Sequence, residues 1–292
     1  MSKLSDAIES GRFVVTSEIG PPKGINTQAM WDEAERLRDK VVAVNVTDNQ
    51  SSVMRIGSPA VCKGLLERGL EPVLQVTCRD RNRLALQSDL LGAAMLGIEN
   101  VLALTGDHTL LGDHPEAKPV FDLDSVSLLG AMSMLEEGTD LAGNALDGAP
   151  KFFKGAVAAP CADNVELQII KLEKKVEAGA QFIQTQAVYD PAAFEGFMER
   201  ITHIKVPVLV GILMLKSPKQ AEYMNKNVAG VHVPEALIKE IADTDEKDRR
   251  KKSVEIAVRL IERCRPMCRG AHIMPLGWGG EVPKIIDGLG PA

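Results

Sequence analysis

The chain has 292 residues, and its 34 lysine and arginine residues against 40 aspartate and glutamate residues give a formal net charge of −6. Its 45% hydrophobic and 25% charged content is typical of a globular protein with a large core. The negative, evenly mixed charge disfavours general nucleic-acid binding. The longest uninterrupted apolar run, residues 206–215, is too short to span a bilayer. Five cysteines without a paired framework, and an amino terminus without an apolar leader, lead us to expect a cytoplasmic protein.

Short apolar, β-branched runs alternate with longer amphipathic stretches along the whole chain. The runs, which we predict to be strands, cover residues 13–19, 41–47, 72–78, 101–105, 154–159, 182–187, 206–213 and 271–276. The stretches between them, which we predict to be helices, cover residues 27–40, 59–68, 82–96, 125–137, 164–178, 191–204, 217–225 and 246–264.

This order of elements predicts the fold class. Apolar strands without regular alternation are typical of parallel sheets that are buried on both faces. Strands that alternate with helices indicate βαβ units, and eight such strands predict an α/β fold of the (β/α)8 TIM-barrel type. A doubly wound open sheet is the alternative. No low-complexity linker divides the chain, so we expect a single domain over residues 1–292. The long irregular stretches 106–124 and 138–151 are candidate functional loops.

Polar residues gather where the predicted strands end. They are Ser17, Glu18, Asn45, Thr47, Asp48, Gln75, Thr77, Thr105, Asp107, Gln184, Thr185 and Gln186, with Gly106 between Thr105 and Asp107. In barrel enzymes these strand ends meet at one mouth, where the chemistry takes place. A carboxylate there can serve as a general acid. Three of these residues also have a purely structural interpretation. Glu18 can form a salt bridge with Lys23, Asp107 can cap a turn, and Gln186 can form hydrogen bonds with backbone groups at the top of the barrel.

Other motifs give no site. Cys264, Cys268 and His272 are metal-ligating residue types at regular spacing, but no second pair of ligands accompanies them. We therefore predict no metal site. The sequence contains no Walker-type phosphate loop, no G-x-G-x-x-G fingerprint after a strand and no G-x-S-x-G motif.

The strand ends resemble those of the methylenetetrahydrofolate reductase family, whose members are flavin-dependent (β/α)8-barrel enzymes. The resemblance runs from residue 13 to residue 286. Short segments carry it in the family's order: residues 17–22 (SEIGPP), 44–47 (VNVT), 76–78 (VTC), 104–107 (LTGD), 174–180 (KKVEAGA), 184–190 (QTQAVYD) and 210–213 (VGIL). No segment is decisive by itself, but their order makes the combination specific.

The resemblance implies reduction of 5,10-methylenetetrahydrofolate to 5-methyltetrahydrofolate by hydride transfer from a reduced flavin, FAD or FMN. It implies that Glu18 is the general acid, that Asp107 lies by the flavin and the pterin, and that Gln186 hydrogen-bonds the pterin. It places the flavin contacts at Thr47, Gln75, Thr77, Thr105, Gly106, Asp107 and Lys175. A lysine suits a flavin phosphate, because its ammonium offers a point charge with several donors.

The sequence departs from the NADH-using bacterial members of that family. Ser217 stands where they have an aromatic residue that stacks on nicotinamide and folate, and Thr105 stands where they have an arginine. Further differences fall at Gln75, Pro160, Gln168 and the Gly277–Trp278 pair. These departures imply the anaerobe type of reductase, which receives electrons from a partner subunit carrying iron–sulfur or zinc centres. The family also implies a homo- or hetero-oligomer.

Two rival hypotheses remain at the level of sequence. The first is a non-catalytic folate-binding or scaffold barrel in a larger redox complex, against which the joint presence of Glu18, Asp107 and Gln186 argues. The second is a barrel lyase or aldolase, which needs a Schiff-base lysine or metal ligands at the strand ends. Lys154 begins a predicted strand and so lies at the wrong end of the barrel for that role.

Overall fold

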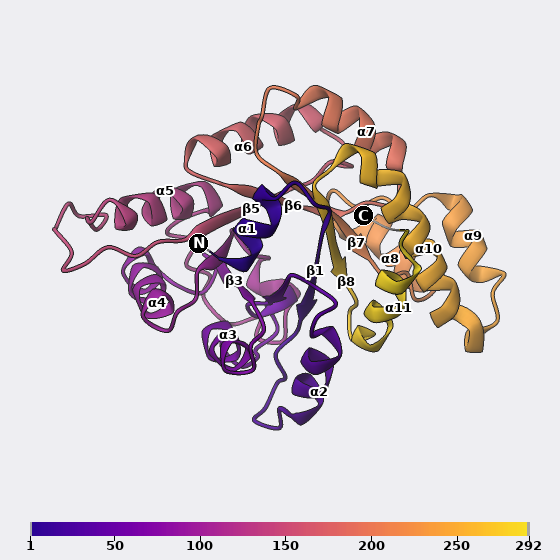
Figure 1. Cartoon of the computed structure of the whole chain (residues 1–292), viewed down its shortest axis with the longest axis horizontal. Helices are drawn as coiled ribbons and strands as arrows, with labels where there is room; N and C mark the ends of the chain where they lie inside the picture. The colour runs from indigo at the N-terminus through magenta and orange to yellow at the C-terminus, as the bar shows by residue number, and fades with distance from the viewer. Residues whose placement is uncertain (1, 291–292) are drawn as a thin grey trace.

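In the computed structural model, which describes residues 2–290, eight parallel strands close into a barrel in the order β1 to β8 (Figure 1). The strands are β1 (Val14–Ile19), β2 (Ala43–Val46), β3 (Pro72–Thr77), β4 (Asn100–Leu104), β5 (Phe153–Ala158), β6 (Phe182–Ala187), β7 (Val208–Leu213) and β8 (Gly270–Met274). Each lies within a few residues of its predicted range. Because β8 pairs with β1, the sheet has no edge and the open-sheet alternative is wrong. Residues 1, 291 and 292 of the predicted domain lie outside the described residues.

The eight predicted helices are all present around the barrel. They are α2 (Gln28–Leu37), α3 (Ser58–Glu67), α4 (Arg83–Met95), α5 (Ser125–Glu136), α6 (Val165–Glu177), α7 (Pro191–Arg200), α8 (Pro218–Asn227) and α10 (Arg249–Cys264). Polar caps fix several starts: the side chains of Asn82, Asp124 and Asn164 accept hydrogen bonds from the first-turn backbone N–H groups of α4, α5 and α6. Between residues 2 and 290, no helix is both long and apolar enough to span a membrane.

Three further helices were not predicted: α1 (Lys3–Glu9), α9 (Glu235–Ala242) and α11 (Val282–Gly288). Helix α1 buries Leu4, Ala7 and Ile8 against inward-facing strand residues such as Val14 and Phe182. In Figure 1 this helix lies across the opening formed by the strand starts. It therefore closes the end of the barrel opposite to the carboxyl ends of the strands.

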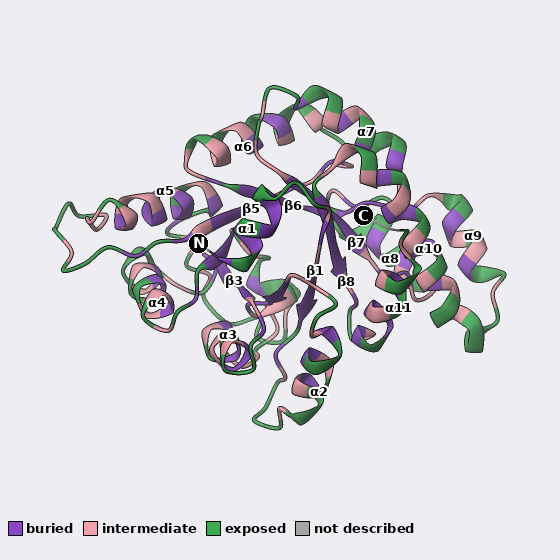
Figure 2. Ribbon diagram, viewed as in Figure 1, coloured by how far each residue is buried: buried purple, intermediate pink, exposed green. Residues whose placement is uncertain are grey.

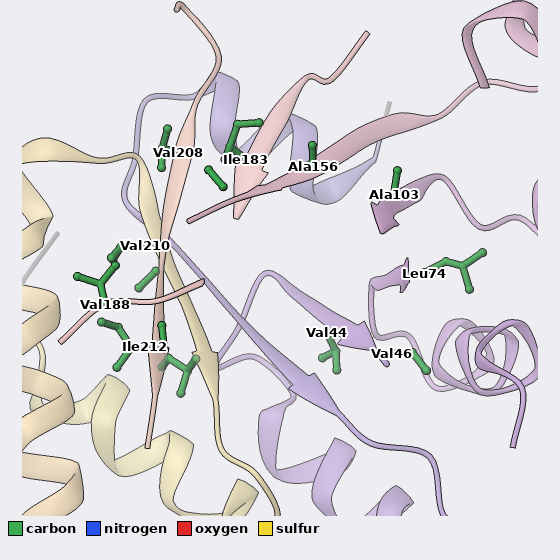
Figure 3. Packing of buried hydrophobic residues seen from close by; sticks show 14 of the residues in the cluster. Val44, Val46, Leu74, Ala103, Ala156, Ile183, Val188, Val208, Val210 and Ile212 are labelled. Atoms are coloured by element: carbon green, nitrogen blue, oxygen red, sulfur yellow. The ribbon is translucent and has the colours of Figure 1, made fainter. Parts of the chain in front are cut away.

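Alternate residues of each strand face the surrounding helices and form the main core. Figure 3 shows members of this core on several strands, among them Val44, Val46, Leu74, Ala103 and Ile212. The helices contribute their inner faces to the same cluster, while their outer faces are exposed (Figure 2). Because the strands are buried on both faces of the sheet, they appear in the sequence as largely apolar runs.

Candidate active site

The barrel brings the predicted site residues to one end, because parallel strands all finish at the same face. Glu18 lies on β1 and Thr47 directly follows β2. Gln75 and Thr77 lie on β3, residues 105–107 directly follow β4, and Gln186 lies on β6. The mouth is therefore rimmed by predicted residues from five of the eight strands. Lys175 is separate from these strand ends, on helix α6.

Glu18 is a buried carboxylate of this mouth, with only 6% of its surface exposed. Its Oε2 atom lies 3.8 Å from Nε2 of His272, which reaches into the barrel from the neighbouring strand β8. Nδ1 of His272 is 3.0 Å from the Thr16 hydroxyl, so both ring nitrogens face polar atoms of β1. Sequence reasoning considered His272 only as a metal ligand and missed this pairing with Glu18.

An amide pair forms the layer beneath the mouth. Asn45 of β2 and Gln184 of β6 exchange two hydrogen bonds across the barrel interior, at 2.7 and 3.2 Å. Both side chains are buried, and mutual pairing satisfies the donor and acceptor that each brings inside. The sequence marked these residues as polar strand positions, but gave no signal that they pair with each other.

The Gln186 side chain lies above this layer at an irregularity of β6. The ladder between β6 and β7 shifts register between Gln184 and Ala187. The Thr185 hydroxyl fills the gap by accepting from the Gly211 N–H at 2.8 Å and donating to the Gln186 carbonyl at 2.8 Å. Gln186 itself is exposed, unlike the rest of its strand. Bulges beside active sites commonly re-aim a side chain, and this one leaves the Gln186 amide available at the mouth.

Thr47 carries an orphaned polar atom. Its side chain is buried, yet Oγ1 finds no hydrogen-bond partner in the part of the chain that the structure describes. A buried hydroxyl without a partner costs free energy, so such an atom points to a missing ligand. A Cβ placed on neighbouring Gly20 would lie 3.8 Å from this hydroxyl, so the site is close to the start of the loop after β1. These observations fit a bound cofactor at Thr47.

The other residues predicted to contact the flavin differ in whether their side chains are free to bind a ligand. Gln75 is buried. Thr77 already forms hydrogen bonds within the protein, since its N–H and its hydroxyl both donate to the Asp48 carboxylate at 2.9 Å. The Thr105 hydroxyl accepts from the N–H of Ser125 at 3.1 Å, so it faces the start of α5. Thr77 and Thr105 would therefore contact a ligand through backbone atoms or after rearrangement of these bonds.

Gly106 and Asp107 form the turn that follows β4. Gly106 has φ +93°, and a Cβ there would lie 3.1 Å from Cβ of Thr77 and 3.2 Å from Cβ of Arg79. Both the left-handed conformation and this close approach favour glycine. The turn presents Asp107 with an exposed side chain at the rim.

Lys175 lies behind the rim on α6, where its Nζ donates to the Val157 carbonyl at 2.6 Å. Burial and the nearby charge of Lys171 lower the pKa of the Lys175 ammonium to about 8. This position adjoins the carboxyl-terminal half of β5, one side of the mouth. A cation held partly out of water is suited to an anion such as a phosphate.

The cysteine and histidine residues that suggested a metal do not converge. The Cys268 thiol points to the carbonyls of Cys264 and Gly270, at 3.2 and 3.4 Å, whereas His272 points into the barrel. No group of three or more His, Cys, Asp or Glu side chains among residues 2–290 has a metal-binding arrangement.

Comparison with known proteins gives a consistent family signal. The family model described as methylenetetrahydrofolate reductase matches residues 3–290. The 5,10-methylenetetrahydrofolate reductase of Salmonella typhimurium is 29% identical over 86% of this chain and 82% of its own length. Methylenetetrahydrofolate reductase 2 of Schizosaccharomyces pombe is 27% identical over 98% of this chain, which spans 47% of that longer relative.

Solved structures confirm the fold. A Clostridium thermocellum protein, described as binding two copies of 5-methyl-5,6,7,8-tetrahydrofolic acid, superposes with a TM-score of 0.61 over 97% of both chains at 15% identity. An F420-dependent secondary alcohol dehydrogenase gives a TM-score of 0.56 over 96% of this chain and 100% of its own, at 13% identity. At these identities the likeness concerns the barrel alone.

Proposed function

The chain belongs to the methylenetetrahydrofolate reductase family and is an oxidoreductase, and from this premise we propose that it reduces 5,10-methylenetetrahydrofolate to 5-methyltetrahydrofolate. The observation that carries the proposal is a buried carboxylate, Glu18, in a mouth that also presents Asp107 and Gln186. We propose that one flavin- and folate-binding barrel domain, residues 1–292, performs the reaction.

The residues present fit a flavin. The orphaned Thr47 hydroxyl offers a hydrogen bond at the mouth, and the Lys175 ammonium offers a positive charge behind it. When bound, a flavin supplies the hydride chemistry, whereas the protein supplies orientation and proton transfer. FAD and FMN both satisfy these contacts, because each carries a phosphate.

Glu18 is the proposed general acid. Its carboxyl group donates a proton to a nitrogen of the five-membered ring of the substrate, which opens the ring and makes the methylene carbon electrophilic. The low exposure of Glu18 keeps water away from this proton transfer. His272 at 3.8 Å and Thr16 beyond it hold the polar side of the carboxyl group within the barrel.

Asp107 and Gln186 are the proposed substrate ligands. A carboxylate accepts hydrogen bonds from the N–H groups of a pterin, and a carboxamide both donates and accepts. Both side chains are exposed at the mouth, Asp107 in the turn after β4 and Gln186 on β6, so they are free to bind a ring that lies over the barrel. Binding from two sides would orient the methylene carbon toward the flavin.

We propose that electrons arrive through a partner subunit with iron–sulfur or zinc centres, in a homo- or hetero-oligomer. One residue supports this proposal. Ser217 stands at the position of the family's stacking aromatic residue. It is the N-cap of α8, where its hydroxyl accepts a hydrogen bond from the Gln220 N–H at 3.2 Å. Serine has no aromatic ring on which a nicotinamide could stack. The expected cytoplasmic location stays a prediction.

The visible spectrum of the purified chain tests the proposed function. We expect the absorption bands of an oxidised flavin, and chromatography of the chromophore released by denaturation identifies FAD or FMN. Anaerobic NADH should leave these bands unbleached, whereas rapid bleaching would contradict the partner-dependent route. A chain that stays colourless after incubation with either flavin would overturn the flavin mechanism and favour a folate-binding scaffold.

Flavin affinity should depend on pH through Lys175. Because the pKa of its ammonium is lowered to about 8, the positive charge is present at pH 7 and is lost as the pH rises toward 9. We expect the dissociation constant for FMN or FAD to rise over that interval by roughly tenfold, the value of one charge-assisted hydrogen bond. Fluorescence titration of the apoprotein between pH 7 and 9.5 measures it.

Matched lysine variants assign this pH dependence. In Lys175→Arg the guanidinium stays protonated, so the profile should flatten. The neighbouring, exposed Lys174→Met is the control and should keep the wild-type profile. Identical profiles in Lys175→Arg and the wild type would remove Lys175 from the flavin site.

A further inference from the structure

A buried arginine stands beside the mouth and has no part in the proposed chemistry. Arg79 follows β3 by two residues, and only 2% of its side chain is exposed. A guanidinium is costly to remove from water, so a buried one persists only where its N–H groups find partners. The identity of those partners therefore shows what Arg79 does.

The guanidinium is engaged on every nitrogen. Nε and one terminal nitrogen donate to the two carboxylate oxygens of Asp80, at 2.8 and 2.7 Å. The terminal nitrogens also donate to two backbone carbonyls, that of Asp107 at 3.3 Å and that of Asn49 at 3.2 Å. These four bonds use four of the five N–H groups, so the side chain is committed mainly to the protein itself. It joins the loops that follow β2, β3 and β4.

The loop after β2 needs such a brace. Asn49, Ser51 and Ser52 all have positive φ, between 45° and 58°, a conformation that costs free energy in residues other than glycine. Strained backbone of this kind persists only where neighbouring groups hold it in place. Arg79 holds it directly through the Asn49 carbonyl. The same loop begins with Thr47, the residue with the orphaned hydroxyl.

The long loop after β4, residues 106–124, is held by Arg79 at both ends. Its start is fixed by the bond to the Asp107 carbonyl, and its end by the Val120 N–H, which donates to the Arg79 carbonyl at 2.8 Å. Between these points the loop lies on the loop after β2, since a Cβ on Gly112 would overlap the Ser52 carbonyl. Arg79 is thus the common anchor of the two loops.

We propose that Arg79 is a positioning residue that fixes Asp107, and with it the rim of the mouth, for hydride transfer to the folate. This inference rests on the proposed function, in which Asp107 binds the pterin. Arg79 acts through the backbone of Asp107 and touches neither substrate nor cofactor. The planar fork of arginine makes four bonds here, to both oxygens of Asp80 and to two carbonyls, whereas lysine has three donors on a single nitrogen and cannot keep all four.

A double-mutant cycle between Arg79→Lys and Asp107→Asn tests the inference. The measured quantity is the rate at which methylenetetrahydrofolate reoxidises the photoreduced flavoprotein in anaerobic stopped flow. We expect Arg79→Lys to slow this step by about tenfold or more, because small misplacements of a binding group are costly. If Arg79 acts through Asp107, the double variant should be no slower than Asp107→Asn alone. Effects that multiply would overturn the inference, as would a wild-type rate in Arg79→Lys.

Amide hydrogen exchange gives a second readout that needs no turnover. In Arg79→Lys we expect faster exchange at residues 109–112 and 120, with unchanged exchange in the strands of the barrel. Arg38→Lys, at a partly exposed arginine paired with Glu35, is the charge-matched control. Unchanged loop exchange in Arg79→Lys would overturn the inference even if folate turnover changed. If the wild type itself fails to react with methylenetetrahydrofolate, the proposed function fails, and loop exchange alone decides whether Arg79 anchors these loops.

Discussion

In the Glu18→Gln variant we expect reoxidation of the reduced flavoprotein by methylenetetrahydrofolate to slow by about 10²- to 10⁴-fold, the usual contribution of a general acid. Glutamine is nearly isosteric with glutamate but has no acidic proton, so the shape of the mouth is kept while proton donation is lost. Flavin binding should persist, because none of the proposed flavin contacts involves Glu18. Stopped-flow reoxidation and the flavin spectrum measure the two properties on one sample.

The exposed residue Glu195 on α7 provides the matched control, since Glu195→Gln makes the same chemical change away from the mouth. It should retain the wild-type rate. Full folate turnover in Glu18→Gln would show that another group supplies the proton, and His272 would then be the residue to test next. Loss of flavin together with activity would instead show that Glu18 supports the cofactor site.

The barrel was predictable because its strands carry their own signal. Residues such as Val44 and Val46 face the helices, and their alternate neighbours are buried inside the barrel, so the strands are largely apolar apart from single polar residues such as Asn45. The short helices α1, α9 and α11 were missed because seven or eight residues give too few turns for periodicity to stand out. In α1 the spacing of Leu4, Ala7 and Ile8 was the available signal.

The place of the candidate residues at the mouth was predictable only where residue type and strand position coincide, and their roles stay predictions. Glu18, Asp107 and Gln186 are polar residues at strand ends, and the family pattern gave each a role. Arg79 could not be found in this way, because a charged residue in a loop ordinarily indicates solvent. Its burial depends on carbonyls and a carboxylate that come from three separate loops, and only the closed barrel brings these together.

The opposite end of the barrel should govern stability without affecting the chemistry. Leu4 of α1 is fully buried, and its cluster includes Val73 and Phe182 from the interior of the barrel. We expect Leu4→Ala to lower the free energy of unfolding by about 3 kcal/mol, because a buried leucine leaves both lost transfer energy and a cavity. For a chain of this size that corresponds to a fall in Tm of roughly 5 °C, measurable by thermal unfolding.

The reoxidation rate of the folded Leu4→Ala variant should stay within about twofold of the wild type at 20 °C, since barrel enzymes place chemistry at the carboxyl ends of the strands and stability at the other face. Ile25→Ala, at a position 96% exposed, is the control and should leave Tm unchanged. An unaltered Tm in Leu4→Ala would mean that α1 does not close the barrel in solution. A loss of reoxidation rate well beyond twofold in the folded variant would mean that the two ends are coupled, and the amide pair of Asn45 and Gln184 in the barrel interior would then be the first connection to test.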